Sequence, residues 1–455
     1  MSWSIVKSGN LFSFVTSGSR GWAKFYSDKG PVFLRMGNLD HDSISLDLRD
    51  IQRVRPPGDT EGTRTRVQPL DILISITADV GMIGIIPDNF EEAYINQHVS
   101  LARPRSTVHP QYLAWYLSSP AAQRQFRELQ RGATKVGLGL DDIRAVDVPL
   151  PLIQEQRRIV AEIEKQFTRL DVGVAALRRV QANLKSYRAA VLKAACEGSL
   201  VPTEAELGRT GIEHKTFESG ETLLAKILTE RRKNWKGRGK YKEPATPDVS
   251  SLPRLPKGWT WATADQLTSV ITDGEHITPK RTSSGILLLS ARNVLDGQIL
   301  LDDVDYVPQY EYDRIAKRLV IVPGDVLLSC SGSVGRSAVV PEGLQFTLVR
   351  SVAVLKPLFG MGKYLSIALR SPFLKQQITE KQTQTAQANI FQGKIKVLCL
   401  PLPPLAEQRR LVAEVERRLS VIMELATMVS DNLQRAARLR QAILQEAFTE
   451  EHVQS

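Results

Sequence analysis

Two segments of the chain, residues 154–199 and 406–455, place an apolar residue at every seventh position, which is the spacing of a coiled-coil helix. The first series is Ile163, Leu170, Leu177, Leu184 and Val191, and Phe167 and Val174 follow its first two members by four residues. The second series is Val415, Ile422, Val429, Ala436 and Ile443, with Leu419, Ala426 and Leu433 between its members. We therefore predict two long helices of about 43 residues each, or roughly 64 Å at 1.5 Å per residue.

The segments before these helices, residues 1–153 and 252–405, are dominated by short β-type runs that glycine, proline and aspartate interrupt. DILISIT at 71–77 and DVLLSCS at 325–331 are examples of such runs. A short helix is predicted near residues 110–130, with a counterpart near 362–382. Prolines stand directly before each long helix, where their fixed φ suits the first helical turn. The pattern predicts two domains of mixed α/β (α+β) class.

The chain is an internal repeat, and this decides the expected architecture. PLPLIQEQRRIVAEIE at 149–164 and PLPPLAEQRRLVAEVE at 401–416 are identical at 11 of 16 positions, at an offset of 252 residues. Further landmarks follow in the same order at nearly the same offset, among them YLAWYLSSP at 112–120 and YLSIALRSP at 364–372. We expect two copies of one domain, related by pseudo-two-fold symmetry within a single polypeptide.

The apolar stripe of each long helix needs a partner, and the other helix is the simplest one because it carries the same stripe. A two-fold axis across the pair would make the helices antiparallel. The alternatives are that each helix packs on its own domain, or that two chains dimerise through the helices. Gly173, Gln181 and Arg188 weaken the predicted seam locally, the glycine by about 1 kcal/mol.

Residues 200–251 form a connector of different character. Its segment RRKNWKGRGKYK at 231–242 holds seven basic residues and no acidic one, and the residues that follow are rich in proline and serine. This composition predicts a solvated loop. The basic run either contacts DNA phosphates, which would add affinity but no sequence choice, or is an exposed linker and nothing more.

Composition narrows the class of protein. Lys plus Arg is 60 and Asp plus Glu is 49, so the net charge of +11 favours a polyanionic partner, although many basic proteins bind no nucleic acid. The three cysteines are far apart and form no CxxC pair, which fits a reducing cytoplasm better than a disulfide framework or a zinc ribbon. No apolar run approaches the ~20 residues of a membrane helix, and the first residues do not resemble a signal peptide.

Enzymatic signatures are missing from the sequence. It contains no Walker A motif for nucleotide phosphates, no Asn/Asp-Pro-Pro-Tyr/Phe motif of aminomethylating DNA methyltransferases, and no GxGxxG between a strand and a helix. The six histidines lack the HxxxH or HxH spacing of a metal site. Together these absences indicate a recognition or scaffold role, without a catalytic residue or a bound metal on this chain.

The repeated PLP, EQ, RR and AE block ahead of a long helix resembles the specificity subunit of type I restriction–modification systems. LPKGWTWATADQL at 255–267 and WSIVKSGNL at 3–11 resemble the starts of that family's recognition domains, and KYKEPATPD at 240–248 resembles its connector. RSAVVPEG at 336–343 and QTAQANIFQGKIKVLCLPLPPLAEQ at 384–408 resemble the closing part of its recognition domains. The first domain departs from the second, with RGATKVGLGLDDI at 131–143 where the second has TQTAQANIFQGKI.

The resemblance implies a division of the chain and of the work. Residues 1–153 and 252–405 would be target-recognition domains, each reading half of a gapped sequence in double-stranded DNA, and helices 154–199 and 406–455 would set the gap. Two modification subunits would carry S-adenosylmethionine chemistry at adenine N6, and two restriction subunits would add ATP- and Mg-dependent cleavage. This chain would hold none of these cofactors and would be no enzyme itself.

Base reading requires side chains such as Arg, Lys, Asn or Gln at groove edges, so polar residues in loops marked by glycine or proline are our candidates for DNA contact. In the first domain they are Ser19, Arg20, Trp22, Lys24, Arg35, Asn38, Arg131, Thr134 and Lys135. In the second domain they are His276, Thr278, Lys280, Arg281, Arg292, Asn293, Thr385, Gln387 and Asn389. For each of them an ordinary solvated side chain is the alternative, and for Trp22 a core position is.

Repeated charged residues at the two helix starts are candidates for partner docking. They are Glu155, Arg157, Arg158, Glu407, Arg409 and Arg410. For the glutamates the alternative is stabilisation of the helix start, where a carboxylate interacts favourably with the helix dipole.

Two other functional classes remain open at this stage. The chain could be a DNA-binding scaffold or regulator of the same ancestry that works without methyltransferase partners, or an enzyme whose site has no recognisable motif. Partner co-purification separates the first from a specificity subunit, and a methyl-transfer assay on the pure chain separates the second.

Overall fold

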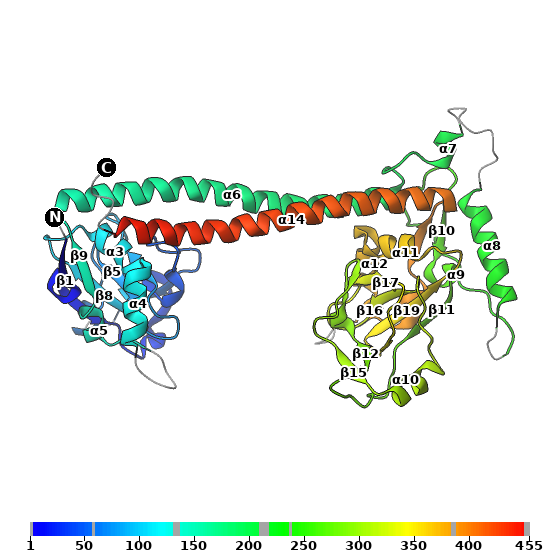
Figure 1. Ribbon diagram of the computed structural model, residues 1–455, viewed down its shortest axis with the longest axis horizontal. Helices are drawn as coiled ribbons and strands as arrows, with labels where there is room; N and C mark the ends of the chain where they lie inside the picture. The colour runs from blue at the N-terminus through cyan, green and yellow to red at the C-terminus, as the bar shows by residue number, and fades with distance from the viewer. Residues whose placement is uncertain are drawn as a thin grey trace. The chain divides into compact units, whose positions relative to one another are not determined.

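The computed structural model describes residues 3–56, 60–130, 137–208, 218–235, 239–383 and 388–449. The chain divides into two compact units, which Figure 1 shows as two groups of strands with their covering helices. Unit 1 comprises Met1–Val180 and Met428–Ser455, and unit 2 comprises Gln181–Thr427. Two long helices, α6 (Ile153–Glu197) and α14 (Leu405–Ala447), each contribute to both units.

Unit 1 contains a mixed α+β domain. Its strands are β1 (Ser4–Lys7), β2 (Phe12–Ser17), β3 (Tyr26–Leu34), β4 (Gln52–Val54), β5 (Ile72–Ser75), β6 (Ile83–Ile85), β7 (Ala93–Ile95), β8 (Val99–Pro104) and β9 (Asp147–Leu150). Its shorter helices are α1 (Ser8–Leu11), η1 (Trp22–Phe25), η2 (Met36–Asn38), α2 (Thr60–Arg64), α3 (Pro110–Ser118), α4 (Pro120–Leu129) and α5 (Leu140–Arg144).

Unit 2 contains the connector and a second domain of the same class. Its strands are β10 (Thr260–Thr263), β11 (Thr268–Asp273), β12 (Ile286–Leu289), β13 (Val294–Leu295), β14 (Gln298–Ile299), β15 (Asp305–Val307), β16 (Val326–Ser329), β17 (Ser337–Val339), β18 (Phe346–Leu348), β19 (Val352–Pro357) and β20 (Cys399–Leu402). Its shorter helices are α7 (Glu204–Leu207), α8 (Gly220–Lys233), α9 (Ala264–Leu267), η3 (Ala291–Asn293), α10 (Gln309–Ala316), α11 (Gly362–Arg370), α12 (Pro372–Lys381) and α13 (Gln392–Lys396).

The two domains have the same sheet topology. Unit 1 has a four-stranded sheet in the order β2-β8-β5-β6, a three-stranded sheet β4-β3-β7 and the pair β1-β9. Unit 2 repeats these as β11-β19-β16-β17, β15-β12-β18 and β10-β20, and adds the hairpin β13-β14. In each three-stranded sheet one pair is parallel, β3 with β7 and β12 with β18. The predicted duplication and mixed class are thereby confirmed, whereas the predicted two-fold relation between the domains stays a prediction.

One inner strand of each four-stranded sheet, β5 or β16, contributes side chains to two hydrophobic cores, because successive side chains of a strand point to opposite faces. Ile72 and Ile74 of β5 lie in one core of unit 1 and Leu73 in another. In β16, Val326 and Leu328 lie in one core of unit 2 and Leu327 in another. Burial on both faces explains why these runs are continuously apolar and do not alternate with polar residues.

The single short helix predicted near 110–130 is two helices, and the same holds near 362–382. Ser119 separates α3 from α4 and accepts a hydrogen bond from the backbone N–H of Ala122 at 3.4 Å. Ser371 caps α12 in the same way, through the N–H of Leu374 at 3.3 Å. A proline follows each serine, and the residue before a proline is disfavoured in helical conformation, which explains the break.

The connector contains more structure than the solvated loop we predicted. Helix α8 buries Leu223 and Ile227 in the core of unit 2. Arg231, part of the basic run, forms an ion pair with Asp265 at 2.9 Å and is only 10% exposed. The prediction was wrong here because the charged and proline-rich flanks hide a short amphipathic helix. Residues 236–238 of the basic run lie outside the described residues.

Inside each unit, the start of one long helix packs against the end of the other. In unit 1, Ile163 and Phe167 near the start of α6 share a core with Leu444 of α14 and with Phe448, which directly follows α14. In unit 2, Val191 and Ala195 of α6 share a core with Leu411 and Val415 of α14. Each unit therefore has the antiparallel sense that we predicted, and the helix ends also pack on the adjoining domain, which was the alternative.

Candidate nucleic-acid interface

The candidate residues of the first domain occupy different environments. Arg20 and Lys24 are exposed, and the Lys24 ammonium lies 4.9 Å from the centre of the Phe25 ring. Ser19 is half-buried and its hydroxyl accepts a hydrogen bond from Arg64 Nη2 at 2.8 Å. Arg35 forms an ion pair with Asp50 at 3.0 Å. Among the described members of this set, Arg20 and Lys24 thus have the most accessible charge.

Trp22 is a core residue. Its side chain is 3% exposed and stacks on Phe33 with ring centres 4.9 Å apart and planes inclined by 14°. It also contacts Tyr94, at 5.5 Å between ring centres. A buried ring has no surface to offer to a nucleic acid, so the predicted DNA contact of Trp22 is corrected to a packing role.

Asn38 and Asn293 are buried hydrogen-bond anchors at equivalent places in the two domains. The Asn38 Oδ1 accepts the backbone N–H of Arg35 at 2.9 Å, and its Nδ2 donates to the carbonyls of Asp47 and Asp50 at 2.8 and 3.1 Å. Asn293 has the same arrangement, with its Oδ1 accepting from Ser290 N at 2.9 Å. Their exposed fractions are 3% and 2%, so both predicted base readers are corrected to residues that hold a loop together.

In the second domain, two of the candidate cations share one carboxylate. Arg292 and Arg281 approach Asp305 at 3.2 and 3.7 Å, and both arginines remain about half exposed. His276 pairs with Asp273 at 3.0 Å. Thr278 and Lys280 are exposed on the same segment. Asp305 therefore brings together two arginines that lie 11 residues apart in the sequence.

The remaining candidates come from the segments 131–135 and 385–389 of the sequence. Arg131, Thr134, Lys135, Thr385 and Gln387 fall outside the described residues. Asn389 is half-buried, and its carbonyl accepts the backbone N–H of Thr383 at 2.8 Å. Asn389 is bridged to Ser331, as Gly137 is to Thr77 in the first domain, so the two domains share this backbone pairing.

The structure adds one hollow that sequence reasoning missed. Lys24, Phe25, Tyr26, Gln52 and Arg55 line a depression of about 540 Å³ on the first domain. Tyr26 is 45% exposed, and an accessible aromatic ring beside cations is a surface on which bases stack. The sequence analysis singled out only Lys24 among these residues. Gln52 lies on strand β4 and Arg55 directly follows it, so both are distant from Lys24 in the sequence.

At the start of α14, Glu407 is fully buried and connects this helix to Trp259 and to Glu204 of the connector. Its Oε1 accepts the indole N–H of Trp259 at 2.9 Å, and its Oε2 accepts the backbone N–H of Glu204 at 3.1 Å. Burial raises the pKa of the Glu407 carboxyl above its ordinary value. Arg410 bonds the Glu204 side chain and donates to the Pro202 carbonyl at 3.1 Å. The predicted docking role of Glu407 is therefore wrong, and Arg410 holds the connector.

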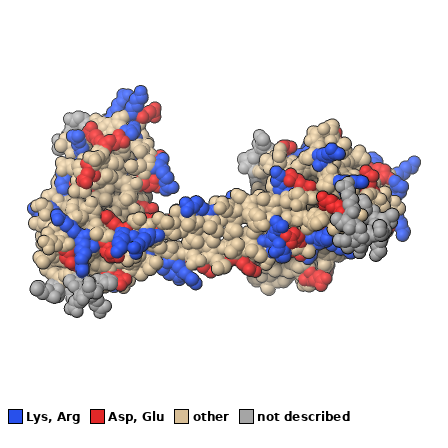
Figure 2. Space-filling view, turned by 90° about the horizontal axis from the view of Figure 1, so that it is seen from above, with Lys and Arg blue, Asp and Glu red and all other residues tan. Residues whose placement is uncertain are grey.

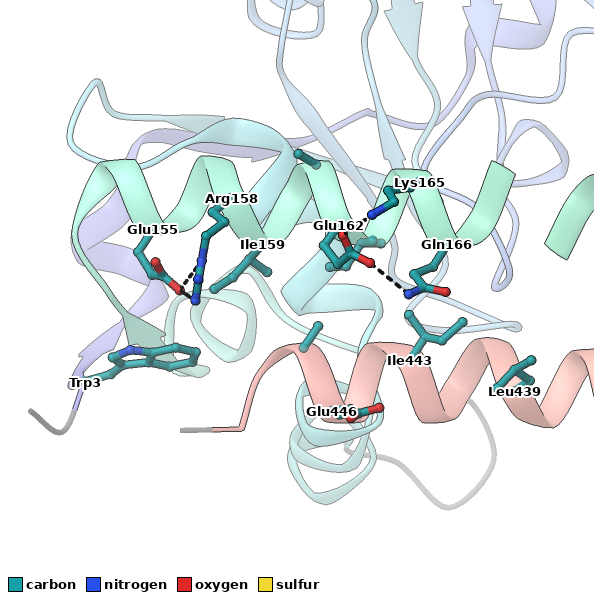
Figure 3. A pocket seen from close by; sticks show the side chains of 13 residues that line it. Trp3, Glu155, Arg158, Ile159, Glu162, Lys165, Gln166, Leu439, Ile443 and Glu446 are labelled. Atoms are coloured by element: carbon teal, nitrogen blue, oxygen red, sulfur yellow. Dashed lines mark hydrogen bonds and ion pairs between the residues drawn. The ribbon is translucent and has the colours of Figure 1, made fainter. Parts of the chain in front are cut away.

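At the start of α6 the repeated residues are more accessible. Glu155 pairs with Arg158 at 2.9 Å, and Arg157 is exposed, as is Arg409 in the second repeat. Figure 3 shows Glu155 and Arg158 beside Trp3 at one end of a pocket of about 690 Å³. Ile159 on α6 and Ile443 and Leu439 on α14 line its apolar part.

Charge does not mark a single binding surface on the face that Figure 2 shows, because basic and acidic side chains are interspersed there in each unit. Within the described residues, no group of three or more His, Cys, Asp and Glu side chains could hold a metal ion. A search of the same part of the chain finds no helix with the length and apolar character needed to cross a bilayer.

Comparison with known protein families matches one segment of the chain. Residues 64–172 match the family model described as the type I restriction modification DNA specificity domain. This segment contains the four-stranded sheet's strands β5, β6 and β8, helices α3 to α5 and the start of α6. The match confirms the resemblance inferred from the repeated block: the chain is related to the specificity subunits of type I restriction–modification systems.

Individual relatives agree with this class. The chain is 24% identical over 309 residues to the type I restriction enzyme EcoBI specificity subunit of Escherichia coli, covering 66% of this chain and 57% of that protein. It is 20% identical over 396 residues to the EcoKI specificity subunit of Escherichia coli (strain K12), covering 84% and 75%. The first match thus spans little more than half of the relative's length.

A solved structure supports the fold across the whole chain. A chain from a study of complex assembly and conformational transition of the type I R-M system superposes with a TM-score of 0.63 at 20% identity. The superposition covers 99% of this chain and 98% of that chain. Two mixed domains joined by long helices are therefore the fold of a known restriction–modification component.

Proposed function

We propose that this chain is the DNA-specificity subunit of a type I restriction–modification system and that it reads a bipartite, gapped target. Each domain would read one half of the target, and α6 and α14 would set the gap. The carrying observation is that one sheet topology occurs twice in a chain whose residues 64–172 match a DNA specificity domain. Duplicated readers on helices suit two short sites at a set spacing.

The accessible cations of each domain are the proposed DNA contacts. In the first domain these are Arg20 and Lys24, with the Tyr26 ring available for stacking. In the second domain they are Arg281 and Arg292, which pair with Asp303 and Asp305 and still remain about half exposed. An arginine can donate two hydrogen bonds to a guanine edge, and exposed lysines neutralise phosphates.

The chemistry would belong to partner subunits in the cytoplasm. Two modification subunits would bind S-adenosylmethionine and methylate adenine N6, and two restriction subunits would use ATP and Mg. We place their docking near the exposed Arg157 and Arg409 and the pocket beside Glu155 and Arg158. The chain itself would carry no catalytic residue and no cofactor, in keeping with relatives that are named specificity subunits.

Methylation mapping of the host genome, with and without this gene, tests the proposal. The expected result is the loss of one gapped, bipartite adenine-methylation motif when the gene is removed. An unchanged methylome in a strain that expresses the chain would contradict it.

The second candidate function is a DNA-binding scaffold that works without methyltransferase partners. It draws on the same basic charge and the same duplicated domains. Co-purification from the native host separates the two functions, because a specificity subunit brings two copies of a modification subunit with it. Turnover of S-adenosylmethionine by the pure chain would instead favour an enzyme.

A further inference from the structure

One arginine in each long helix stands in the apolar seam, where a charged side chain is unfavourable unless it has partners. Arg188 of α6 and Arg440 of α14 are 252 residues apart, the same offset that relates the two repeated blocks. Both are partly buried. Because both helices carry an arginine at the same repeat position of the seam, we compared the partners that each guanidinium contacts.

Arg440 reaches from α14 to the recognition domain of unit 1. Its Nη1 donates to the backbone carbonyl of Asp42 at 2.7 Å, and its Nη2 pairs with Asp171 of α6. The guanidinium lies over the Phe167 ring, 4.2 Å from the ring centre. The side chain is 12% exposed, so these partners hold it in one conformation.

Arg188 makes the corresponding contact in unit 2. Its Nη2 donates to the backbone carbonyl of Asp296 at 2.8 Å. The Asp296 carboxylate in turn binds Lys375 of α12 at 3.1 Å, and the Lys375 ammonium donates to the Gly335 carbonyl at 2.7 Å. The acceptor residue of Arg188 is therefore itself anchored to the covering helix α12 and, through Lys375, to the backbone just before β17.

The two accepting carbonyls lie at equivalent places. Asp42 follows Asn38 of η2 by four residues, and Asp296 follows Asn293 of η3 by three. The buried amides of these asparagines close the base of each loop, because Asn38 donates to the Asp47 carbonyl and Asn293 to the Asp303 carbonyl, each at 2.8 Å. Each loop is thus held at its base by an asparagine and on the helix side by an arginine.

We propose that Arg188 and Arg440 are positioning residues that hold each recognition domain in one orientation on its helix, and thereby make the subunit selective for gap length. The inference rests on the proposed function. Both arginines bond backbone carbonyls, so the contact does not depend on which side chains the loop carries. A domain held in one orientation meets its half-site at one gap length, whereas a loosened domain tolerates neighbouring gaps.

The test measures binding of the full chain to DNA duplexes whose two half-sites, taken from the methylome, are separated by the native gap or by gaps one or two base pairs shorter or longer. Wild type should prefer the native gap at least tenfold. Arg440→Ala and Arg188→Ala should each reduce this preference at least threefold, with base preference in both half-sites unchanged. Arg440→Lys and Arg188→Lys, which keep the positive charge and one donor nitrogen, should restore part of it.

Control variants are Arg438→Ala and Lys185→Ala, which remove exposed cations from the same helices and should leave the gap preference unchanged. Hydrogen exchange gives a second readout, with faster exchange expected in residues 39–50 for Arg440→Ala and in 294–303 for Arg188→Ala. A lower melting temperature with wild-type gap preference and wild-type exchange in these loops would overturn the inference and leave the proposed function standing. Absence of gapped binding by wild type would overturn both.

Discussion

Buried carboxylates recur at equivalent positions of the two domains and are paired each time. Asp71 is completely buried and accepts hydrogen bonds from Arg103 Nε and Nη2 at 2.7 and 2.8 Å and from the Gln68 N–H at 2.7 Å. Asp325 accepts the Val322 N–H at 2.9 Å and pairs with Lys356. Each carboxylate stands directly before the central strand of its sheet, so it fixes the turn that leads into the core.

Asp71→Ala should lower the free energy of unfolding by about 3 kcal/mol, because it leaves the Arg103 charge and the Gln68 N–H without their acceptor. Urea unfolding followed by circular dichroism measures this. Asp50→Ala is the matched control: Asp50 also pairs with an arginine but is 91% exposed, so a loss below about 1 kcal/mol is expected. Equal losses in the two variants would show that burial is not the reason.

The buried Glu407 predicts a pH dependence. Its folded-state pKa is raised above 4.5, chiefly by burial, so the folded protein binds a proton more tightly than the unfolded chain. The stability that tighter proton binding at Glu407 contributes is fully present below pH 4.5 and is lost as the pH rises through the folded pKa. Glu407→Gln cannot titrate, and its stability relative to wild type should therefore increase across that window.

Denaturant unfolding of wild type and Glu407→Gln at closely spaced pH values checks this, since other titrating groups cancel in the difference. A Glu407→Gln difference that falls as the pH rises would contradict the raised pKa.

At the scale of elements, the long helices follow the seven-residue spacing closely. Ile163, Val191, Val415, Ile422 and Val429 are buried. Gly173, which we placed on the seam, is exposed, and a Cβ added there would meet nothing within 4 Å. This glycine therefore costs helix stability without allowing any close approach.

Gly173→Ala should stabilise the protein by about 0.5–1 kcal/mol, because alanine has less backbone freedom to lose and helical backbone accepts it. The melting temperature, measured by calorimetry, should rise. Gly220→Ala serves as the contrasting variant, since its Cβ would lie 2.2 Å from the Leu402 carbonyl oxygen and should destabilise. A melting temperature lowered by Gly173→Ala would contradict the open space around this position.

At the scale of the whole molecule, α6 and α14 each contribute to both units, and under the proposed function their lengths would set the gap. Inserting one heptad into each helix keeps the apolar seam in register. It adds about 10.5 Å at 1.5 Å per residue, which corresponds to about 3 base pairs at roughly 3.4 Å each.

Methylation mapping of such a variant should recover both half-sites with a longer gap. Exchange of residues 1–150 for another domain of the class should alter one half-site only and keep the gap. A heptad insertion that changed base preference in either half-site would contradict the division between readers and spacer.

Much of this architecture was predictable because periodic or repeated sequence patterns specify it. The seven-residue spacing predicted α6 and α14, since a buried stripe must recur with the helical period. The repeated block predicted twin domains, because similar sequences reach similar topologies. Strands β5 and β16 likewise lie inside the predicted runs 71–77 and 325–331, where three consecutive apolar residues suit a strand that is covered on both faces.

The individual roles of polar residues were decided by the tertiary structure alone. Asn38, Asn293 and Trp22 look like surface readers in sequence, yet distant segments bury them, as the connector and Trp259 bury Glu407. The reverse holds for Arg188 and Arg440, which look like defects of the seam until the carbonyls of Asp296 and Asp42 are seen to accept from them. Periodicity reports which residues face a core, but a polar side chain's role depends on partners that only folding brings within hydrogen-bond distance.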